Sequence, residues 1–273
     1  MRAALGHRLL SRGREGVCLL PEWICASMAE TCRKNAWRPA FYAVTLPSRT
    51  GCPFGMAVPA LLQHIESLAA SSVPFMVVLA HPMGYLDPGV EVVVQRLRAE
   101  FGPRAQEMIF LDLSQAYGDR EFFDALTACG SMYWSHNGNK LICCGGAVES
   151  MAVVRAGAGC EAYRREIETN RAAARKEVGS ATEVLRAASS FLGSDRQEPL
   201  LSGQGVTRSS RHRTVIWLPD AGRSQRVRIH LRQQGLGQSV LERPQGANHH
   251  PSEAFQIWRA TTFLLFPCRR APC

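Results

Sequence analysis

The sequence lacks any C-x-x-C pair, although it contains ten cysteines. Most of them lie inside apolar runs such as GVCLLPEWIC and LICCGG, where a free cysteine packs as a small hydrophobic residue. Adjacent His249 and His250 likewise lack further ligands at a metal-binding spacing. This pattern matches neither a zinc site nor a framework of disulfide bridges, so we expect no metal.

A long apolar run is also missing, because no stretch reaches the roughly 18 residues that a membrane-spanning helix needs. The N-terminal stretch MRAALGHRLLSRGREG carries arginines throughout and has no uninterrupted apolar core of the kind found in secretory signals. An Arg-rich start can resemble an organelle transit peptide, but a surface helix is the preferred interpretation. We therefore expect a soluble cytoplasmic protein without a membrane partner.

The net charge of +9 is unevenly distributed, with many arginines between Arg208 and Arg232. Aromatic residues are not interleaved with these arginines, as a platform for stacking nucleic-acid bases would require. A basic face can also attract a phosphorylated small molecule. A solvated basic face, or one that steers an anionic substrate, is favoured here, and a nucleic-acid-binding protein remains the weaker alternative.

The first 150 residues alternate between buried strands and amphipathic helices. Strands are predicted at 17–20, 40–44, 74–80, 108–113, 131–134 and 141–148. Helices are predicted at 3–12, 22–35, 57–70, 90–101 and 121–128. This alternation predicts an α/β domain with a central, mostly parallel sheet over residues 1–150.

The pattern changes after residue 150, and three further regions are expected. Residues 151–193 form a helical connection, with one long helix or two within 160–192, and the polar stretch 194–212 is a linker. Residues 213–273 form a small C-terminal α+β domain. Its strands are predicted at 214–218, 239–241 and 262–266, and its helices at 223–234 and 251–259.

The candidate chemistry lies between Phe110 and Gly146, where Asp112, Ser135 and Lys140 fall at or just after predicted strands. Functional residues of parallel α/β sheets collect at such strand ends. We hypothesise that the Lys140 amine holds the aldehyde of pyridoxal 5'-phosphate as a Schiff base. A carboxylate must then keep the pyridine nitrogen protonated, which suits Asp112, and Ser135 is a candidate phosphate donor. Taken singly, such residues are more often a helix cap, a turn former and a solvated loop lysine.

Four segments resemble one enzyme family, the DegT/DnrJ/EryC1/StrS-type aminotransferases. They are LLPEWICASMAETCRKNAWRPAFYAV, VVLAHPMGY, FLDLSQAYG and SHNGNKLICCGGAV, which together span roughly residues 1–150. The resemblance implies the aspartate aminotransferase fold (type I), with a large pyridoxal-phosphate-binding domain and a small C-terminal domain. It also implies a homodimer.

The resemblance assigns a role to five residues. Trp23 would stack on the cofactor ring, Asp112 would pair with the pyridine nitrogen, and Gln115 would lie near the ring hydroxyl. Ser135 would hold the phosphate, and Lys140 would be the Schiff-base lysine. The implied reaction transfers an amino group, usually from glutamate, to a nucleotide-linked keto-sugar in polysaccharide or amino-sugar biosynthesis.

Two departures from the family pattern bear on this interpretation. Leu111 stands where family members usually carry a glutamate before the aspartate. The family's Gly-Thr/Ser phosphate loop lies upstream of the helix that begins here at residue 3, so we expect the chain to start inside the fold. Loss of that loop would remove backbone N–H groups that anchor the phosphate. The alternative is therefore a truncated, inactive aminotransferase-like protein with a binding or regulatory role.

Overall fold

The computed structural model describes residues 2–13, 15–45, 55–81, 87–113, 131–136, 150–155, 200–201, 214–217, 220–234 and 246–265. Its strands are β1 (Gly16–Pro21), β2 (Trp37–Tyr42), β3 (Phe75–Ala80), β4 (Ile109–Asp112), β5 (Ser131–His136), β6 (Ser150–Arg155), β7 (Leu200–Leu201), β8 (Thr214–Trp217) and β9 (Thr262–Leu265). Its helices are α1 (Arg2–Ser11), α2 (Ala26–Lys34), α3 (Val58–Ala70), α4 (Pro88–Phe101), the 3₁₀ turn η2 (Gly102–Arg104), α5 (Ala105–Met108), α8 (Ala221–Gln233) and α9 (Glu253–Thr261). Within these ranges, no helix has both the length and the apolar character needed to cross a membrane.

The main sheet has six strands in the order β2-β1-β3-β4-β5-β6. The first five are parallel to one another, and β6 runs antiparallel to β5. The chain passes from β1 outward to β2 and then crosses back to β3 on the other side of β1. The point at which the strand order reverses therefore lies between β1 and β3. The prediction of an α/β fold with a central, mostly parallel sheet is confirmed.

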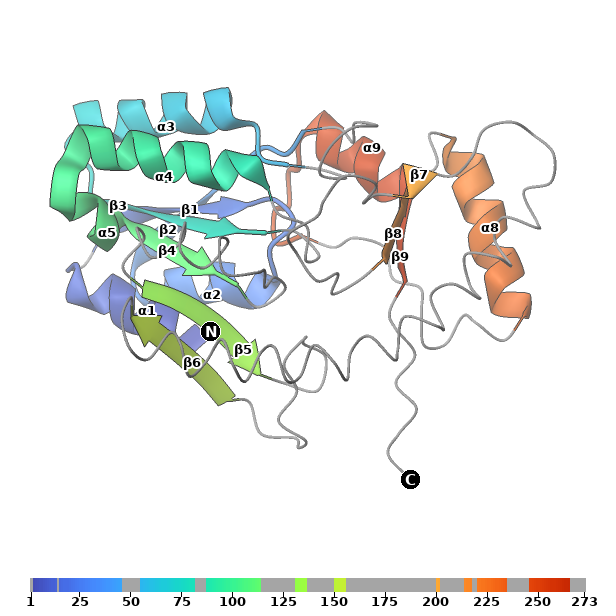
Figure 1. Ribbon diagram of the computed structural model, residues 1–273, viewed down its shortest axis with the longest axis horizontal. Coiled ribbons are helices and arrows are strands. Elements are labelled where there is room, and N and C mark those ends of the chain that lie inside the picture. The colour runs from blue at the N-terminus through green and yellow to red at the C-terminus, as the bar shows by residue number, and fades with distance from the viewer. Residues whose placement is uncertain are drawn as a thin grey trace.

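Helices cover both faces of this sheet, with α3 and α4 on one face and α1 and α2 on the other (Figure 1). The continuous apolar runs of β1 and β3 are buried along their whole length, because each strand supplies side chains to both layers. Alternate residues therefore enter two separate core clusters, so that Leu19 and Val77 pack toward α3 and α4 while Cys18 and Met76 pack toward α1 and α2.

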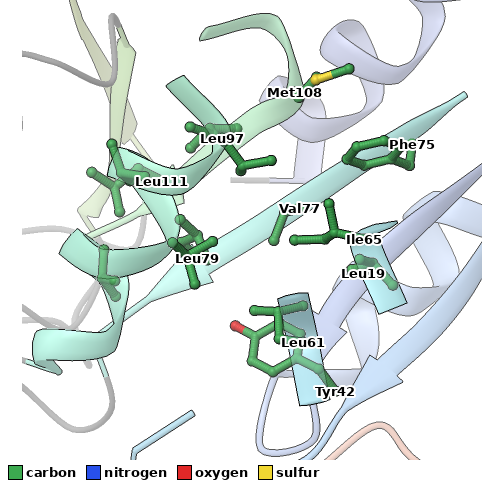
Figure 2. Close-up of a cluster of buried hydrophobic side chains, with 14 of the residues drawn as sticks. Leu19, Tyr42, Leu61, Ile65, Phe75, Val77, Leu79, Leu97, Met108 and Leu111 are labelled. Atoms are coloured by element: carbon green, nitrogen blue, oxygen red, sulfur yellow. The ribbon is translucent and has the colours of Figure 1, made fainter. Parts of the chain in front are cut away.

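The core beneath α3 and α4 is built from aliphatic side chains of the helices and of β1, β3 and β4. Figure 2 shows Ile65 of α3 close to Leu19 of β1 and Val77 of β3, and Leu61 of α3 close to Tyr42 of β2. Tyr42 lies at the edge of this cluster, and its hydroxyl donates a hydrogen bond to the Val78 carbonyl oxygen at 2.9 Å. This bond connects the carboxyl ends of β2 and β3, which are not adjacent in the sheet.

A second sheet has the order β7-β8-β9 and is antiparallel throughout. It lies with α9 on the side toward which the parallel strands of the main sheet point, and α8 lies further out (Figure 1). The strands predicted at 214–218 and 262–266 and the helices predicted at 223–234 and 251–259 are all present, with ends that differ by about two residues. Strand β7 falls inside the stretch 194–212 that was predicted to be a linker.

Strand β6 (Ser150–Arg155) lies almost wholly within the stretch 151–193 that was predicted to be a helical connection. Two further element boundaries differ from the prediction by more than two residues. The helix predicted at 22–35 begins at Ala26, because residues 22–25 form a turn in which the Ile24 N–H donates to the Pro21 carbonyl. The strand predicted at 40–44 begins at Trp37, whose backbone pairs in register with Gly16 of β1. The elements predicted at 121–128, 141–148, 160–192 and 239–241 lie outside the described residues.

Candidate active site

The five parallel strands of the main sheet end at one edge, and the residues that follow them form the candidate site. In open α/β sheets, ligands bind beyond the carboxyl ends of the strands, at the point where the strand order reverses. Here that point lies between β1 and β3. Trp23 follows β1, His81 follows β3, and Asp112 ends β4.

Asp112 and Ser135 lie on adjacent strands near this edge. Asp112 pairs in register with Ala80 of β3 on one side and with Tyr133 of β5 on the other. Ser135 is two residues beyond Tyr133, which places its Cα on the order of 8 Å from that of Asp112, given ordinary strand spacing and rise. The expectation that both residues fall at strand ends is confirmed. The predicted Lys140 and Gln115 lie outside the described residues.

Trp23 lies in the turn after β1, and its side chain is 8 % exposed. The turn closes through the hydrogen bond between the Ile24 N–H and the Pro21 carbonyl oxygen at 3.0 Å. Trp23 is thus fixed at the carboxyl edge, next to the reversal point of the sheet. This is the edge at which a ligand ring would have to lie for Trp23 to stack on it.

His81 is a buried residue of this edge that sequence reasoning did not single out. Its Nδ1 accepts a hydrogen bond from the Asp87 backbone N–H at 2.9 Å, so that Nε2 carries the proton of the neutral ring. Burial lowers the pKa of His81 to about 3, because a charged imidazolium would lose its hydration. His81 is therefore a neutral structural group at neutral pH. The signal was its position directly after the buried run FMVVLA.

Asp87, the N-cap residue of α4, lies next to His81. One carboxylate oxygen accepts from the Gly89 N–H as the helix N-cap, and the other accepts from the Met56 N–H, both at 2.8 Å. Burial raises the pKa of the Asp87 carboxyl, and the two backbone hydrogen bonds act in the opposite direction. The Asp-Pro-Gly sequence at 87–89 is a helix-start signal that could have identified this cap.

Glu22, between Pro21 and Trp23, is a second buried charged residue that the sequence reasoning overlooked. Its side chain is 3 % exposed, and its carboxylate accepts hydrogen bonds from Val44, Asn248 and Ser252. The last two residues belong to the segment that leads into α9. A signal was available, since a glutamate that directly follows a fully apolar strand must have partners if it is buried. Two of those partners, Asn248 and Ser252, are more than 200 positions away in the chain.

The carboxyl edge of the main sheet thus carries the half-buried carboxylate of Asp112, the serine Ser135 and the tryptophan Trp23. A carboxylate can hold a proton on a ring nitrogen, a serine hydroxyl can donate to a phosphate, and an indole can cover an aromatic face. Within the described ranges, no group of three or more His, Cys, Asp or Glu residues is arranged to hold a metal ion.

No protein-family model matches the chain, and no curated protein matches it. Solved structures do match. A DegT/DnrJ/EryC1/StrS aminotransferase from Brucella abortus is 15% identical with a TM-score of 0.63, and the match covers 97% of this chain and 78% of that one. The putative sugar aminotransferase Spr1654 from Streptococcus pneumoniae, in its PMP form, is 13% identical with a TM-score of 0.68, over 97% of this chain and 79% of that one. The chain has the fold of these aminotransferases.

A third structure with this aminotransferase fold is DesI, solved in the presence of its TDP-sugar product. It is 17% identical to this chain with a TM-score of 0.61, and the match covers 97% of this chain and 73% of DesI. The fold type expected from the sequence resemblance is thereby confirmed. The four sequence segments that resemble these aminotransferases and the three-dimensional match thus point to the same fold.

Proposed function

We propose that the protein is a pyridoxal-phosphate-dependent aminotransferase that transfers an amino group to a keto-sugar. The observation that carries this proposal is the placement of Asp112 and Ser135 on adjacent strands at the carboxyl edge of an aminotransferase fold. These are the residue types that the cofactor requires, a carboxylate for the ring nitrogen and a hydroxyl for the phosphate. Trp23 lies at the same edge and is the proposed stacking residue.

Each residue has a defined task in this proposal. When bound, the cofactor supplies an electron sink that lets a proton leave the carbon next to an amino group. The Asp112 carboxylate would hold a proton on the ring nitrogen, and the Ser135 hydroxyl would donate to the phosphate. The Lys140 amine would hold the cofactor through its aldehyde carbon and move the proton, and Gln115 would lie near the ring hydroxyl. Since Asp112 is half-buried, its interaction with the ring nitrogen is less screened than it would be in water.

Two further observations support the proposed substrate class. Spr1654 is described as a putative sugar aminotransferase, and DesI was solved with a TDP-sugar product. The chain carries a net charge of +9, which favours the approach of an anionic, phosphorylated substrate. We therefore extend the proposal to a nucleotide-linked keto-sugar as amino acceptor and glutamate as donor. We also propose that the protein is cytoplasmic and forms a homodimer. Light scattering on the purified protein tests the oligomeric state.

The first half of the transfer provides a direct test. Protein loaded with pyridoxal phosphate is mixed with L-glutamate, and 2-oxoglutarate and pyridoxamine phosphate are quantified by mass spectrometry. Equal amounts of the two products should form in the wild type, and none should form in K140A. If the cofactor binds but neither product forms with any amino donor, the enzyme proposal is overturned in favour of a non-catalytic aminotransferase-like binding protein.

A further inference from the structure

The buried Glu22 carboxylate joins three separate parts of the chain. Its Oε2 accepts from the Val44 N–H at 3.3 Å and from the Ser252 hydroxyl at 2.7 Å. Its Oε1 accepts from the Ser252 N–H at 2.6 Å and from the Asn248 side-chain amide at 3.3 Å. The turn after β1, the residues after β2 and the segment Gly246–Ser252 are thus held at one point.

The segment Gly246–Ser252 approaches Glu22 through its backbone as well. A Cβ added at Gly246 would collide with the Glu22 carbonyl oxygen, so only glycine permits this approach. At the other end of the segment, the Ser252 hydroxyl accepts from the Phe255 N–H at 3.2 Å and caps α9. The same hydroxyl donates to Glu22, so the cap and the anchor share one side chain.

We propose that Glu22 is a positioning residue that anchors the segment Gly246–Ser252 and the start of α9 against the carboxyl edge of the sheet. Glu22 directly precedes Trp23 in the turn next to the reversal point between β1 and β3. The groups that hold Glu22 therefore also hold the turn that carries Trp23. In consequence, the C-terminal segment is part of the candidate site. Figure 1 shows α9 beyond the ends of the parallel strands.

The chemistry of the junction requires a carboxylate. All four groups that face Glu22 donate, and a carboxylate only accepts. A glutamine of the same size would turn its own N–H groups toward the N–H of Val44 or of Ser252, whichever way its amide is placed. Because Glu22 and Val44 are buried and Asn248 and Ser252 are half-buried, the unpaired donors would weaken the junction. E22Q therefore replaces one acceptor oxygen with a donor group while it preserves the side-chain volume.

Hydrogen exchange on the full-length protein measures how far Glu22 stabilises the segment Gly246–Ser252 and the start of α9. In E22Q, amides of 246–261 and of the turn 22–25 should exchange at least about tenfold faster, while those of β3 keep their wild-type protection. E30Q is the matched control, because Glu30 is an exposed carboxylate on α2, outside the segment Gly246–Ser252 and outside α9. It should leave exchange unchanged. Wild-type protection of 246–261 in E22Q, or an equal loss of protection in β3, would overturn the proposal.

A second variant tests the anchor independently, in case E22Q does not fold. N248A removes one of the four donors and leaves the carboxylate in place. Because it also removes two hydrogen bonds between Asn248 and His250, exchange in the turn 22–25 is the decisive readout for this variant. N248A should raise exchange in the same two segments by a smaller factor. Unchanged exchange there in N248A would contradict the anchor even if E22Q cannot be purified.

The effect of the Glu22 anchor on cofactor binding rests on the proposed function, and it is measured separately from hydrogen exchange. The Kd for pyridoxal phosphate, measured by quenching of tryptophan fluorescence, should rise about tenfold in E22Q and stay constant in E30Q. If E22Q loosens 246–261 yet binds the cofactor as the wild type does, the segment is anchored but is not part of the site. If the wild type itself does not bind, the proposed function fails, and the exchange data alone decide the anchor.

Discussion

The Asp87 backbone N–H donates to Nδ1 of His81 at 2.9 Å, and both residues are buried. This bond fixes His81 in the neutral form with its proton on Nε2, and burial lowers the pKa of His81 to about 3. The unfolded chain, with an ordinary histidine pKa of 6.5, binds a proton between pH 6.5 and 3 that the folded chain does not bind. The stability associated with neutral His81 is therefore complete above pH 6.5 and declines as the pH falls.

This relationship predicts a pH-dependent stability that H81N removes. Between pH 7.5 and 5.0, His81 should lower the free energy of unfolding by about 2 kcal/mol. H81N has no ring to protonate, and its Oδ1 can still accept from the Asp87 N–H. Urea unfolding of both proteins at the two pH values isolates the contribution of His81 as a difference. An identical pH dependence in both proteins would contradict the buried neutral state.

The two aspartate N-caps should differ in their contribution to stability. Asp87 is buried and accepts from both Gly89 and Met56, whereas Asp220 is exposed and accepts from the Arg223 N–H at 2.7 Å. D87A should lower the free energy of unfolding by about 2 to 4 kcal/mol, because it removes the cap and leaves the Met56 N–H unpaired. D220A, the matched control, should cost about 1 kcal/mol or less. Equal losses in urea unfolding would show that the second bond of Asp87 contributes nothing.

Asp112 should affect turnover rather than binding. D112N keeps the size of the side chain but removes the negative charge that holds a proton on the ring nitrogen. We expect the rate of the glutamate half-reaction to fall about a hundredfold or more, with a much smaller change in cofactor Kd. D220N changes an aspartate outside the site and should leave the rate unchanged. A wild-type rate in D112N would remove Asp112 from the proposed mechanism.

Trp23 should contribute to cofactor affinity through its aromatic face. W23F retains an aromatic ring, whereas W23L retains apolar bulk without one. The Kd for pyridoxal phosphate should rise several-fold more in W23L than in W23F, in line with about 0.5 to 1.5 kcal/mol for an aromatic pair. Isothermal titration gives both values. If the two variants bind equally, the Trp23 side chain supports the turn but does not stack on the ring.

Local sequence patterns were sufficient to predict most of the main sheet. The apolar runs at 17–20 and 74–80 predicted the buried strands β1 and β3, and helical spacing at 57–70 and 90–101 predicted α3 and α4. The same reasoning placed Asp112 and Ser135 near strand ends, where the structure has them. These features depend on residues that are close in the chain.

The features that could not be predicted depend on distant contacts. Glu22 looked like the start of a helix because nothing nearby indicates that Ser252 and Asn248 bind its carboxylate. Strand β2 begins at Trp37 because that residue pairs with Gly16, a register that local hydrophobicity does not report. His81 was seen only as part of a motif, and its neutral state follows from burial in the folded protein. Tertiary contacts decided each of these cases.

Lys140 provides the most direct test of the central claim, that this fold binds pyridoxal phosphate for amino transfer. The protein is incubated with pyridoxal phosphate, reduced with borohydride, digested and mapped by mass spectrometry. The reduced cofactor should be found on the peptide containing Lys140 and be lost in K140A. Lys34, exposed in the last turn of α2, reports nonspecific labelling and should remain largely unmodified. No adduct at Lys140, or equal labelling of Lys34, would contradict the proposed function.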